Sequence, residues 1–166
     1  HWTASDWEEK RDQAQAIIDV GMGWDITDYG RGDFETMGLF LFTVRNGKAE
    51  DLSKGTGMLY AEKIMISRKN QLSPMHFHKV KAEDIINRGG GDLIIELYHS
   101  NQQGGLDEEK EVSVMCDGMA RTVQAGGRIC LKPGESVTLL PRVYHAFWGE
   151  GDDVLIGEVS TVNDDN

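Results

Sequence analysis

The sequence contains little cysteine and no long apolar run. Only Cys116 and Cys130 occur among 166 residues, at a spacing that matches neither a zinc knuckle nor a redox motif, so a disulfide framework is not expected. No stretch approaches the roughly 20 apolar residues that a membrane-spanning helix needs. The first ten residues lack the basic and then apolar pattern of a signal peptide. These features predict a cytoplasmic protein.

Basic residues are also scarce, with 17 Lys and Arg against 28 Asp and Glu, for a net charge of −11. Such a surface repels phosphate groups, so neither nucleic acid nor an anionic membrane is expected as a partner. The hydrophobic fraction of 39% and the charged fraction of 27% are those of an ordinary globular protein. A chain of this length predicts a single domain.

The N-terminal region carries helix signals. Ser5 to Glu8 has the form of a capping box, which predicts a helix from about Asp6 to Asp19 that ends at Gly21 and Gly23. We expect residues 1–29 to be a helix and connector packed on the remainder. The chain begins with His1 and not Met, which fits a segment of a longer protein.

The rest of the chain, residues 30–166, predicts short strands separated by turns, and hence a sandwich or barrel. Turn formers such as Arg88-Gly-Gly-Gly-Asp92 separate the strands. The predicted strands are 37–45, 58–67, 74–77, 93–99, 111–114, 136–140, 146–148 and 154–161.

Four residues have the composition of a metal site. His76 and His78 alternate along a predicted strand, so both rings project from one face. Glu83 follows shortly after, and His145 lies far downstream. Three imidazoles and one carboxylate suit Mn²⁺, Fe²⁺, Co²⁺, Ni²⁺ or Zn²⁺ and leave coordination positions open for substrate. The His-x-His pair alone is weak evidence, because hydrogen-bonded histidines are common.

The order and spacing of these residues strengthen the metal interpretation. His76-x-His78-x4-Glu83-x6-Gly90, followed by Gly134-x6-Pro141-x3-His145, resembles the two motifs of the cupin superfamily. The resemblance implies an all-β fold, the cupin double-stranded β-helix or jelly-roll barrel, with metal ligands His76, His78, Glu83 and His145. The second motif departs from the usual Pro-x-Gly, because Pro141-Arg-Val-Tyr precedes His145.

Longer runs are similar to one family within the superfamily, the D-lyxose ketol-isomerases. They are residues 75–90, 144–148 and 157–165, with weaker similarity at 24–28 and 38–43. The resemblance implies interconversion of D-lyxose and D-xylulose, and of D-mannose and D-fructose, through an enediol. It also implies Mn²⁺ as the metal, a homodimer, and family chains that extend further at both ends.

Proton transfer needs a group that is not a metal ligand, and two candidates stand out. The resemblance implies an active-site lysine at Lys81, which would otherwise be a solvated loop lysine. Glu158 shares a face of the last predicted strand with Ile156 and Ser160, so its carboxylate points either into the barrel or to the surface. We predict that Lys81 and Glu158 are the catalytic residues.

Substrate contacts are predicted for Trp148 and Asp164. Trp148, with Phe147 and Tyr144, could form an apolar wall for the sugar, although core packing is the simpler interpretation of Phe147. Asp164 could bind sugar hydroxyls, although charged residues near a chain end are usually solvated.

Two other functions fit the same pattern. An Fe²⁺ dioxygenase would use the same ligands but would consume O₂ and need no proton relay. A non-catalytic sugar-binding cupin would bind its ligand without turnover. A barrel with incidental histidines and no metal is the remaining interpretation, and the number of motif matches makes it the weakest of the three.

Overall fold

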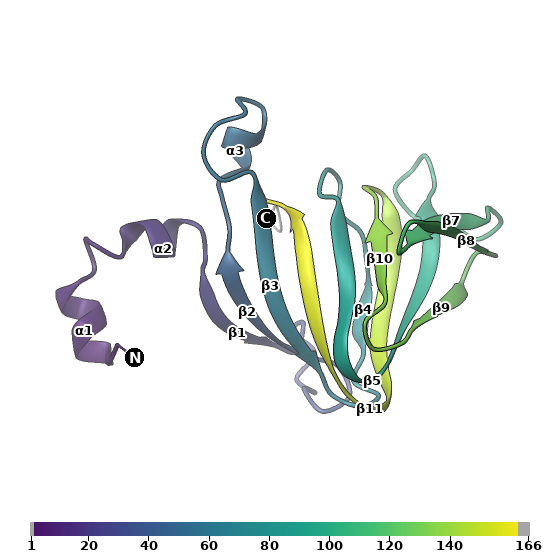
Figure 1. The fold of residues 1–166 in the computed structure, drawn as a ribbon, viewed down its shortest axis with the longest axis horizontal. Helices are drawn as coiled ribbons and strands as arrows, with labels where there is room; N and C mark the ends of the chain where they lie inside the picture. Colours follow the sequence, from purple (N-terminus) through teal and green to yellow (C-terminus); the bar gives the residue numbers. More distant parts are fainter. Residues whose placement is uncertain (1, 163–166) are drawn as a thin grey trace.

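The computed structural model describes residues 2–162 and consists mainly of one large, strongly curved sheet (Figure 1). Three short helices accompany it in this part of the chain: α1 (Ala4–Glu9), α2 (Gln15–Asp19) and α3 (Ala49–Leu52). The strands are β1 (Gly23–Thr27), β2 (Leu39–Arg45), β3 (Tyr60–Ser67), β4 (Ser73–His76), β5 (Glu83–Ser100), β6 (Leu106–Asp107), β7 (Val112–Cys116), β8 (Met119–Val123), β9 (Gly127–Leu131), β10 (Ser136–Leu139) and β11 (Val143–Thr161).

Two long strands, β5 and β11, organise the barrel. They pair antiparallel along nearly their whole length, from Val143 opposite His99 to Ser160 opposite Glu83. The sheet order is β1-β2-β3-β11-β5-β10-β7-β8, while β4 pairs with β11 and both β6 and β9 pair with β5. Each long strand therefore contributes one half to each side of the barrel. This arrangement confirms the predicted all-β barrel.

A bend in β5 explains why its two halves lie on different sides. The sequence predicted a turn at Arg88 to Asp92, and this prediction was wrong, because β5 continues through these residues. Gly90 has a φ of +97°, and a Cβ there would lie 1.9 Å from the carbonyl oxygen of Asp153 on β11. Glycine allows both the backbone angle and the close approach, so the strand bends without ending.

The N-terminal region also differs from its prediction. In place of one helix from Asp6 to Asp19, two short helices are separated by a turn, and the cap is formed by Thr3 and Asp6. Neither helix contains a buried residue, and both project beside β1 in Figure 1. Without a buried apolar face, a continuous helix gains little from tertiary packing. No helix among residues 2–162 is long and apolar enough to cross a membrane.

The apolar core fills the barrel between β5, β7, β9, β10 and the first half of β11. Leu93, Ile95 and Leu97 of β5 are completely buried and alternate along the strand, as expected for its inward face. Leu131 and Val137 from the neighbouring strands are equally inaccessible. The core continues to Leu39 of β2 and Met65 of β3, and buried polar residues such as Lys63 and Glu158 lie on this side of the barrel.

Candidate active site

A cavity of about 460 Å³ opens inside the barrel next to the apolar core. Such a volume lies in the usual range of small-molecule sites. The lining side chains come from β1, β2, β3, β4, β5, β11 and the loops that join them: Thr27, Tyr29, Leu39, Leu41, Lys63, Met65, Ser73, Pro74, His76, His78, Lys81, Glu83, Ile85, His145, Phe147 and Glu158. The sequence had singled out six of these for chemistry.

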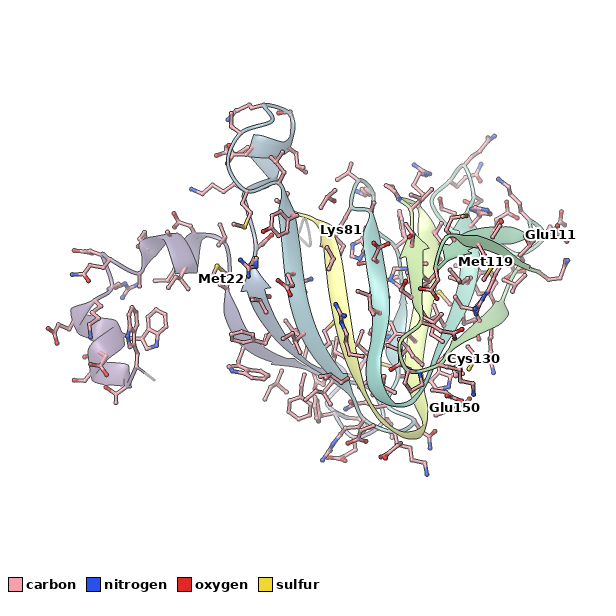
Figure 2. All side chains as sticks on the ribbon, viewed as in Figure 1. Met22, Lys81, Glu111, Met119, Cys130 and Glu150 are labelled. Carbon is pink, nitrogen blue, oxygen red and sulfur yellow. The ribbon has the colours of Figure 1, made fainter. Side chains whose placement is uncertain are left out.

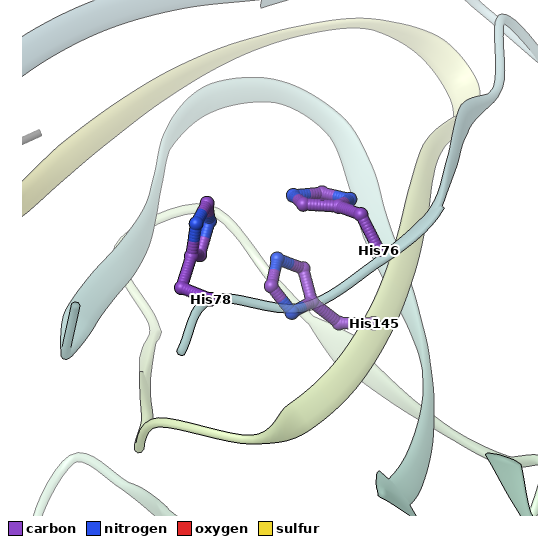
Figure 3. Close-up of side chains that lie close together, drawn as sticks. All are labelled: His76, His78 and His145. Carbon is purple, nitrogen blue, oxygen red and sulfur yellow. The ribbon is translucent and has the colours of Figure 1, made fainter. Parts of the chain in front are cut away.

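Three histidines converge at one wall of this cavity (Figure 3). One ligand atom from each of His76, His78 and His145 lies within 4.8 Å of the other two. The ring centroids of His76 and His145 are 4.2 Å apart. Strand pairing causes this convergence, because His145 of β11 lies directly opposite His76 of β4.

Backbone carbonyls fix two of the rings. The Nδ1 atom of His76 lies 2.8 Å from the carbonyl oxygen of Pro74, and that of His145 lies 3.1 Å from the carbonyl oxygen of Val143. If each Nδ1 donates to its carbonyl, each Nε2 carries a lone pair. Metal-binding histidines are usually held in this way.

Glu83 lies beside the histidines, in a position that favours the binding of a cation. Its Oε1 atom is 3.0 Å from Nε2 of His145, and its Oε2 atom is 3.5 Å from Nε2 of His78. Yet Oε1 is buried and accepts no hydrogen bond from residues 2–162. A carboxylate lone pair facing an imidazole lone pair is unfavourable unless a cation lies between them.

The pKa values of these groups suit metal binding at neutral pH. Burial is the main reason that the pKa of His76 falls to about 3, so its ring is neutral at pH 7. Burial would raise the pKa of Glu83, but the contact with His145 and the positive charge of Lys81 hold it below its usual value. His76 thus presents a neutral nitrogen and Glu83 an ionised carboxylate, the forms that ligate divalent ions.

A second carboxylate lies on the other side of Lys81. The Lys81 ammonium is 2.8 Å from Oε2 of Glu83 and donates a hydrogen bond of 3.1 Å to Oε1 of Glu158. Lys81 is only 2% exposed, so it is a buried residue and not a solvated loop lysine. Of the two orientations that the sequence left open for Glu158, the structure has the inward one, because Glu158 is buried with Ile156 and Ser160 and lines the cavity.

The structure also places two polar side chains, Tyr29 and Ser73, in the cavity wall. The Tyr29 hydroxyl lies 2.5 Å from the hydroxyl of Ser73, and burial raises the pKa of the Tyr29 phenol. Tyr29 has a φ of +55°, an unfavourable angle for a bulky residue. Phe147 and Leu39 supply apolar surface nearby.

Of the two predicted substrate contacts, only Trp148 falls within the described residues, and it does not line this cavity. Trp148 lies on the opposite face of β11 from His145 and Phe147, and its ring packs 4.9 Å from the guanidinium of Arg128. It lines a separate surface pocket with Arg128 and Met75. Asp164 lies outside the described residues.

Sequence reasoning missed Lys63, which lines the cavity from β3. The sequence pattern could have identified Lys63. It lies on the same face of the predicted strand as Ala61, Met65 and Ser67, and this face is buried. A lysine among inward-facing residues of a strand requires a counter-charge. Tyr29 gave no such signal, because it lies in a loop whose path the sequence does not specify.

Comparison of the sequence with known proteins gives a consistent picture. The family model described as D-lyxose isomerase matches residues 1–166. A D-lyxose/D-mannose isomerase of Serratia proteamaculans is 50% identical over 169 residues, covering 100% of this chain and 73% of the relative. A D-lyxose/D-mannose isomerase of Escherichia coli O157:H7 is 48% identical, covering 96% of this chain and 67% of the relative.

Solved structures share the fold at low sequence identity. A mutant L-ribose isomerase of Acinetobacter sp. DL28 in complex with L-ribose has a TM-score of 0.59 at 14% identity, covering 95% of this chain and 80% of the other. L-ribose isomerase of Cellulomonas parahominis with L-ribose has a TM-score of 0.58 at 16% identity, with 94% and 80% coverage. These similarities confirm the predicted cupin-like barrel.

Proposed function

The chain belongs to the D-lyxose isomerase family, and from this membership we propose that it interconverts D-lyxose with D-xylulose and D-mannose with D-fructose. One observation of the structure carries the proposal. A buried carboxylate, Glu158, is joined through Lys81 to Glu83, beside three convergent histidines in one sugar-sized cavity. Ligands for a cation and separate groups for proton transfer thus line the same space.

We propose that His76, His78, Glu83 and His145 bind a divalent metal, with Mn²⁺ as the first candidate. Their chemistry fits such an ion, because two rings are fixed through Nδ1 and the buried Oε1 of Glu83 accepts no hydrogen bond from the described part of the chain. Zn²⁺, Co²⁺, Fe²⁺ and Ni²⁺ accept the same mixture of nitrogen and oxygen ligands. When bound, the ion acts as a Lewis acid that polarises the sugar carbonyl and stabilises negative charge on oxygen.

Isomerisation moves a proton from C2 of the aldose to C1 through an enediol, while a hydroxyl proton passes from O2 to O1. We propose that the Glu158 carboxylate takes the proton from C2 and returns it to C1. Lys81 then exchanges protons with the sugar oxygens, since its ammonium already donates to Glu158. Buried groups in direct contact suit this task, because a general acid or base must lie within hydrogen-bond reach of the group with which it exchanges a proton.

The cavity wall supports a sugar ligand. We propose that Phe147 provides the apolar surface against which the sugar packs, in the position that the sequence had suggested for Trp148. The hydroxyls of Tyr29 and Ser73 are placed to bind sugar hydroxyls. Asp164 remains a candidate contact from the sequence alone.

We further propose that residues 1–29 and the barrel of residues 30–166 act as one domain, since β1 pairs with β2 of the barrel.

The protein is proposed to be a cytoplasmic homodimer. Both cysteines are free thiols, as expected in a reducing compartment. Trp24 and Ile26 on the edge strand β1 are 71% and 61% exposed, and exposed apolar residues of this kind favour a protein partner.

The direct test is formation of ketose from D-lyxose and from D-mannose, measured by a coupled assay on chelated protein and after Mn²⁺ is added back. We expect chelation to lower turnover and Mn²⁺ to restore production of D-xylulose and D-fructose. Oxygen uptake is measured in parallel. Oxygen consumption would favour the dioxygenase interpretation, and sugar binding without turnover would favour a binding protein.

Lys81 allows a test of proton transfer separate from metal binding. We expect Lys81→Met to lower kcat about 10²-fold, within the usual contribution of an acid–base group, while the protein keeps most of its metal. The matched control is Lys79→Met, because Lys79 is an exposed lysine two residues earlier in the same loop. Metal content by mass spectrometry and kcat are measured for both. Equal activity of the two variants would exclude the role of Lys81.

A further inference from the structure

The fold directs a second lysine, Lys63, toward Glu158. Lys63 of β3 lies directly opposite Glu158 of β11 in the antiparallel register. Directly opposite residues have their Cβ atoms about 5 Å apart, and the Lys63 ammonium lies 3.3 Å from Oε1 of Glu158. The register is well specified, because a slip by one residue would turn Lys63 outward and bring Glu62 into the core.

Three donors therefore meet at one carboxylate oxygen. Oε1 of Glu158 lies 3.3 Å from the Lys63 ammonium, accepts a hydrogen bond of 3.1 Å from Lys81, and accepts one of 3.2 Å from the hydroxyl of Ser160. The donors come from β3, from the loop before β5 and from β11. Contacts from three elements leave the carboxylate little freedom to rotate.

The distribution of charge suggests different tasks for the two lysines. Lys81 is shared between Glu158 and Glu83, and it is closer to Glu83. Glu158 is 5% exposed and Lys63 is 6% exposed, so their pairing occurs away from bulk solvent. A buried carboxylate that depended on Lys81 alone would lose its counter-charge whenever Lys81 turned toward the sugar, which is costly.

We propose that Lys63 is a positioning residue for the isomerase reaction, which holds the Glu158 carboxylate in place and balances its charge while Lys81 exchanges protons with the sugar. This inference rests on the proposed function of Glu158. For this role, the Glu158 carboxylate needs a fixed positive charge on the side that faces β3. Lys63 acts through Glu158, and the binding of sugar depends on it much less than turnover does.

The test is a set of four metal-loaded variants: Lys63→Met, Lys63→Arg, Glu158→Gln and the double variant Lys63→Met/Glu158→Gln. We expect Lys63→Met to lower kcat about 10- to 100-fold, the loss that is typical when a residue that orients a metal ligand is replaced, with little change in KM. Lys63→Arg keeps the charge and should recover most of the lost kcat. In the Glu158→Gln background, Lys63→Met should cause no further loss.

Thr43→Val is the matched control, because Thr43 is a buried neighbour of Lys63 on β2, on the side of β3 away from β11. It should leave kcat near that of the parent. The double variant removes both charges, so it keeps the test open if Lys63→Met alone does not fold. In that event, kcat of Lys63→Arg and of the double variant tests the proposal. A double variant with a lower kcat than Glu158→Gln overturns it.

Two outcomes separate this inference from the proposed function. If Glu158→Gln keeps full turnover, the role of Glu158 is wrong, and the role of Lys63 is wrong with it. If Glu158→Gln is impaired while Lys63→Met matches the parent, only the role of Lys63 is overturned. An equal loss caused by Lys63→Met in both backgrounds would also overturn it, because Lys63 would then act independently of Glu158.

Discussion

His76→Ala is expected to abolish isomerase activity while the barrel stays folded. The ring of His76 lies at the centre of the cluster, 4.2 Å from the ring of His145 and 5.2 Å from that of His78. Its loss removes a nitrogen ligand that a backbone carbonyl holds in place. A Lewis acid that contributes about 4 kcal/mol to the transition state accounts for about 10³ in rate, at 1.36 kcal/mol for each factor of ten.

The stability of the metal-free protein should change little with this substitution. His76 lines the cavity and does not belong to the apolar core of β5, β9 and β10. We therefore expect the free energy of unfolding without metal to shift by about 1 kcal/mol or less. Urea unfolding of the chelated proteins measures this directly.

The chain offers a matched control in His99. This histidine lies on β5 opposite Asp107, apart from the three-histidine cluster. His99→Ala should keep both its metal content and its turnover, whereas His76→Ala should lose both. Full activity of His76→Ala after chelation and Mn²⁺ reloading would contradict the metal site.

The sequence predicted the convergence of the three histidines because much of its geometry follows from local rules. His76 and His78 are two residues apart, and Glu83 follows at the spacing of a motif. Only the partnership with His145 required the tertiary fold, and the motif resemblance supplied it. The structure adds what spacing cannot show: Nδ1 of both His76 and His145 contacts a backbone carbonyl.

Strand boundaries were predicted less well, for reasons that lie in the long strands. Gly90 and its neighbours have the composition of a turn, but β11 pairs with β5 on both sides of them. The bend is possible because Gly90 accepts both a positive φ and the contact with Asp153. Local composition cannot distinguish this bend from a chain reversal, because the distinction depends on a partner strand about 60 residues later.

The orientation of side chains on β11 determines which aromatic residue faces the cavity. His145 and Phe147 share the inward face, while Trp148 lies on the outer face over Arg128. The period of two follows from strand geometry, and from the position of His145 it would have favoured Phe147 over Trp148 as the residue that faces the cavity. The face of the strand on which a residue lies was therefore better evidence for a place in the cavity than the presence of a large aromatic ring next to a motif.

Buried charge is the strongest argument that Glu158 takes part in chemistry. Two lysines and two glutamates, Lys63, Lys81, Glu83 and Glu158, are each no more than 6% exposed. Replacing buried ion pairs by apolar residues of similar volume is often neutral or stabilising. Stability alone therefore gives little reason to bury these four charges in one cavity. A role in catalysis would explain their burial.

Glu158→Gln is accordingly expected to lower kcat about 10³-fold, within the range for loss of a general base, while metal content is unchanged. The amide keeps the shape of the side chain and its contact with Ser160, but it cannot take the proton from C2. Solvent deuterium should no longer enter C2 of D-lyxose, which mass spectrometry detects. Glu62→Gln is the matched control, because Glu62 is a half-exposed neighbour of Lys63 that pairs with Arg45. If deuterium still entered the sugar at the parental rate, the proton would have to be taken by another group, and Glu158 would only balance the charge of Lys63 and Lys81.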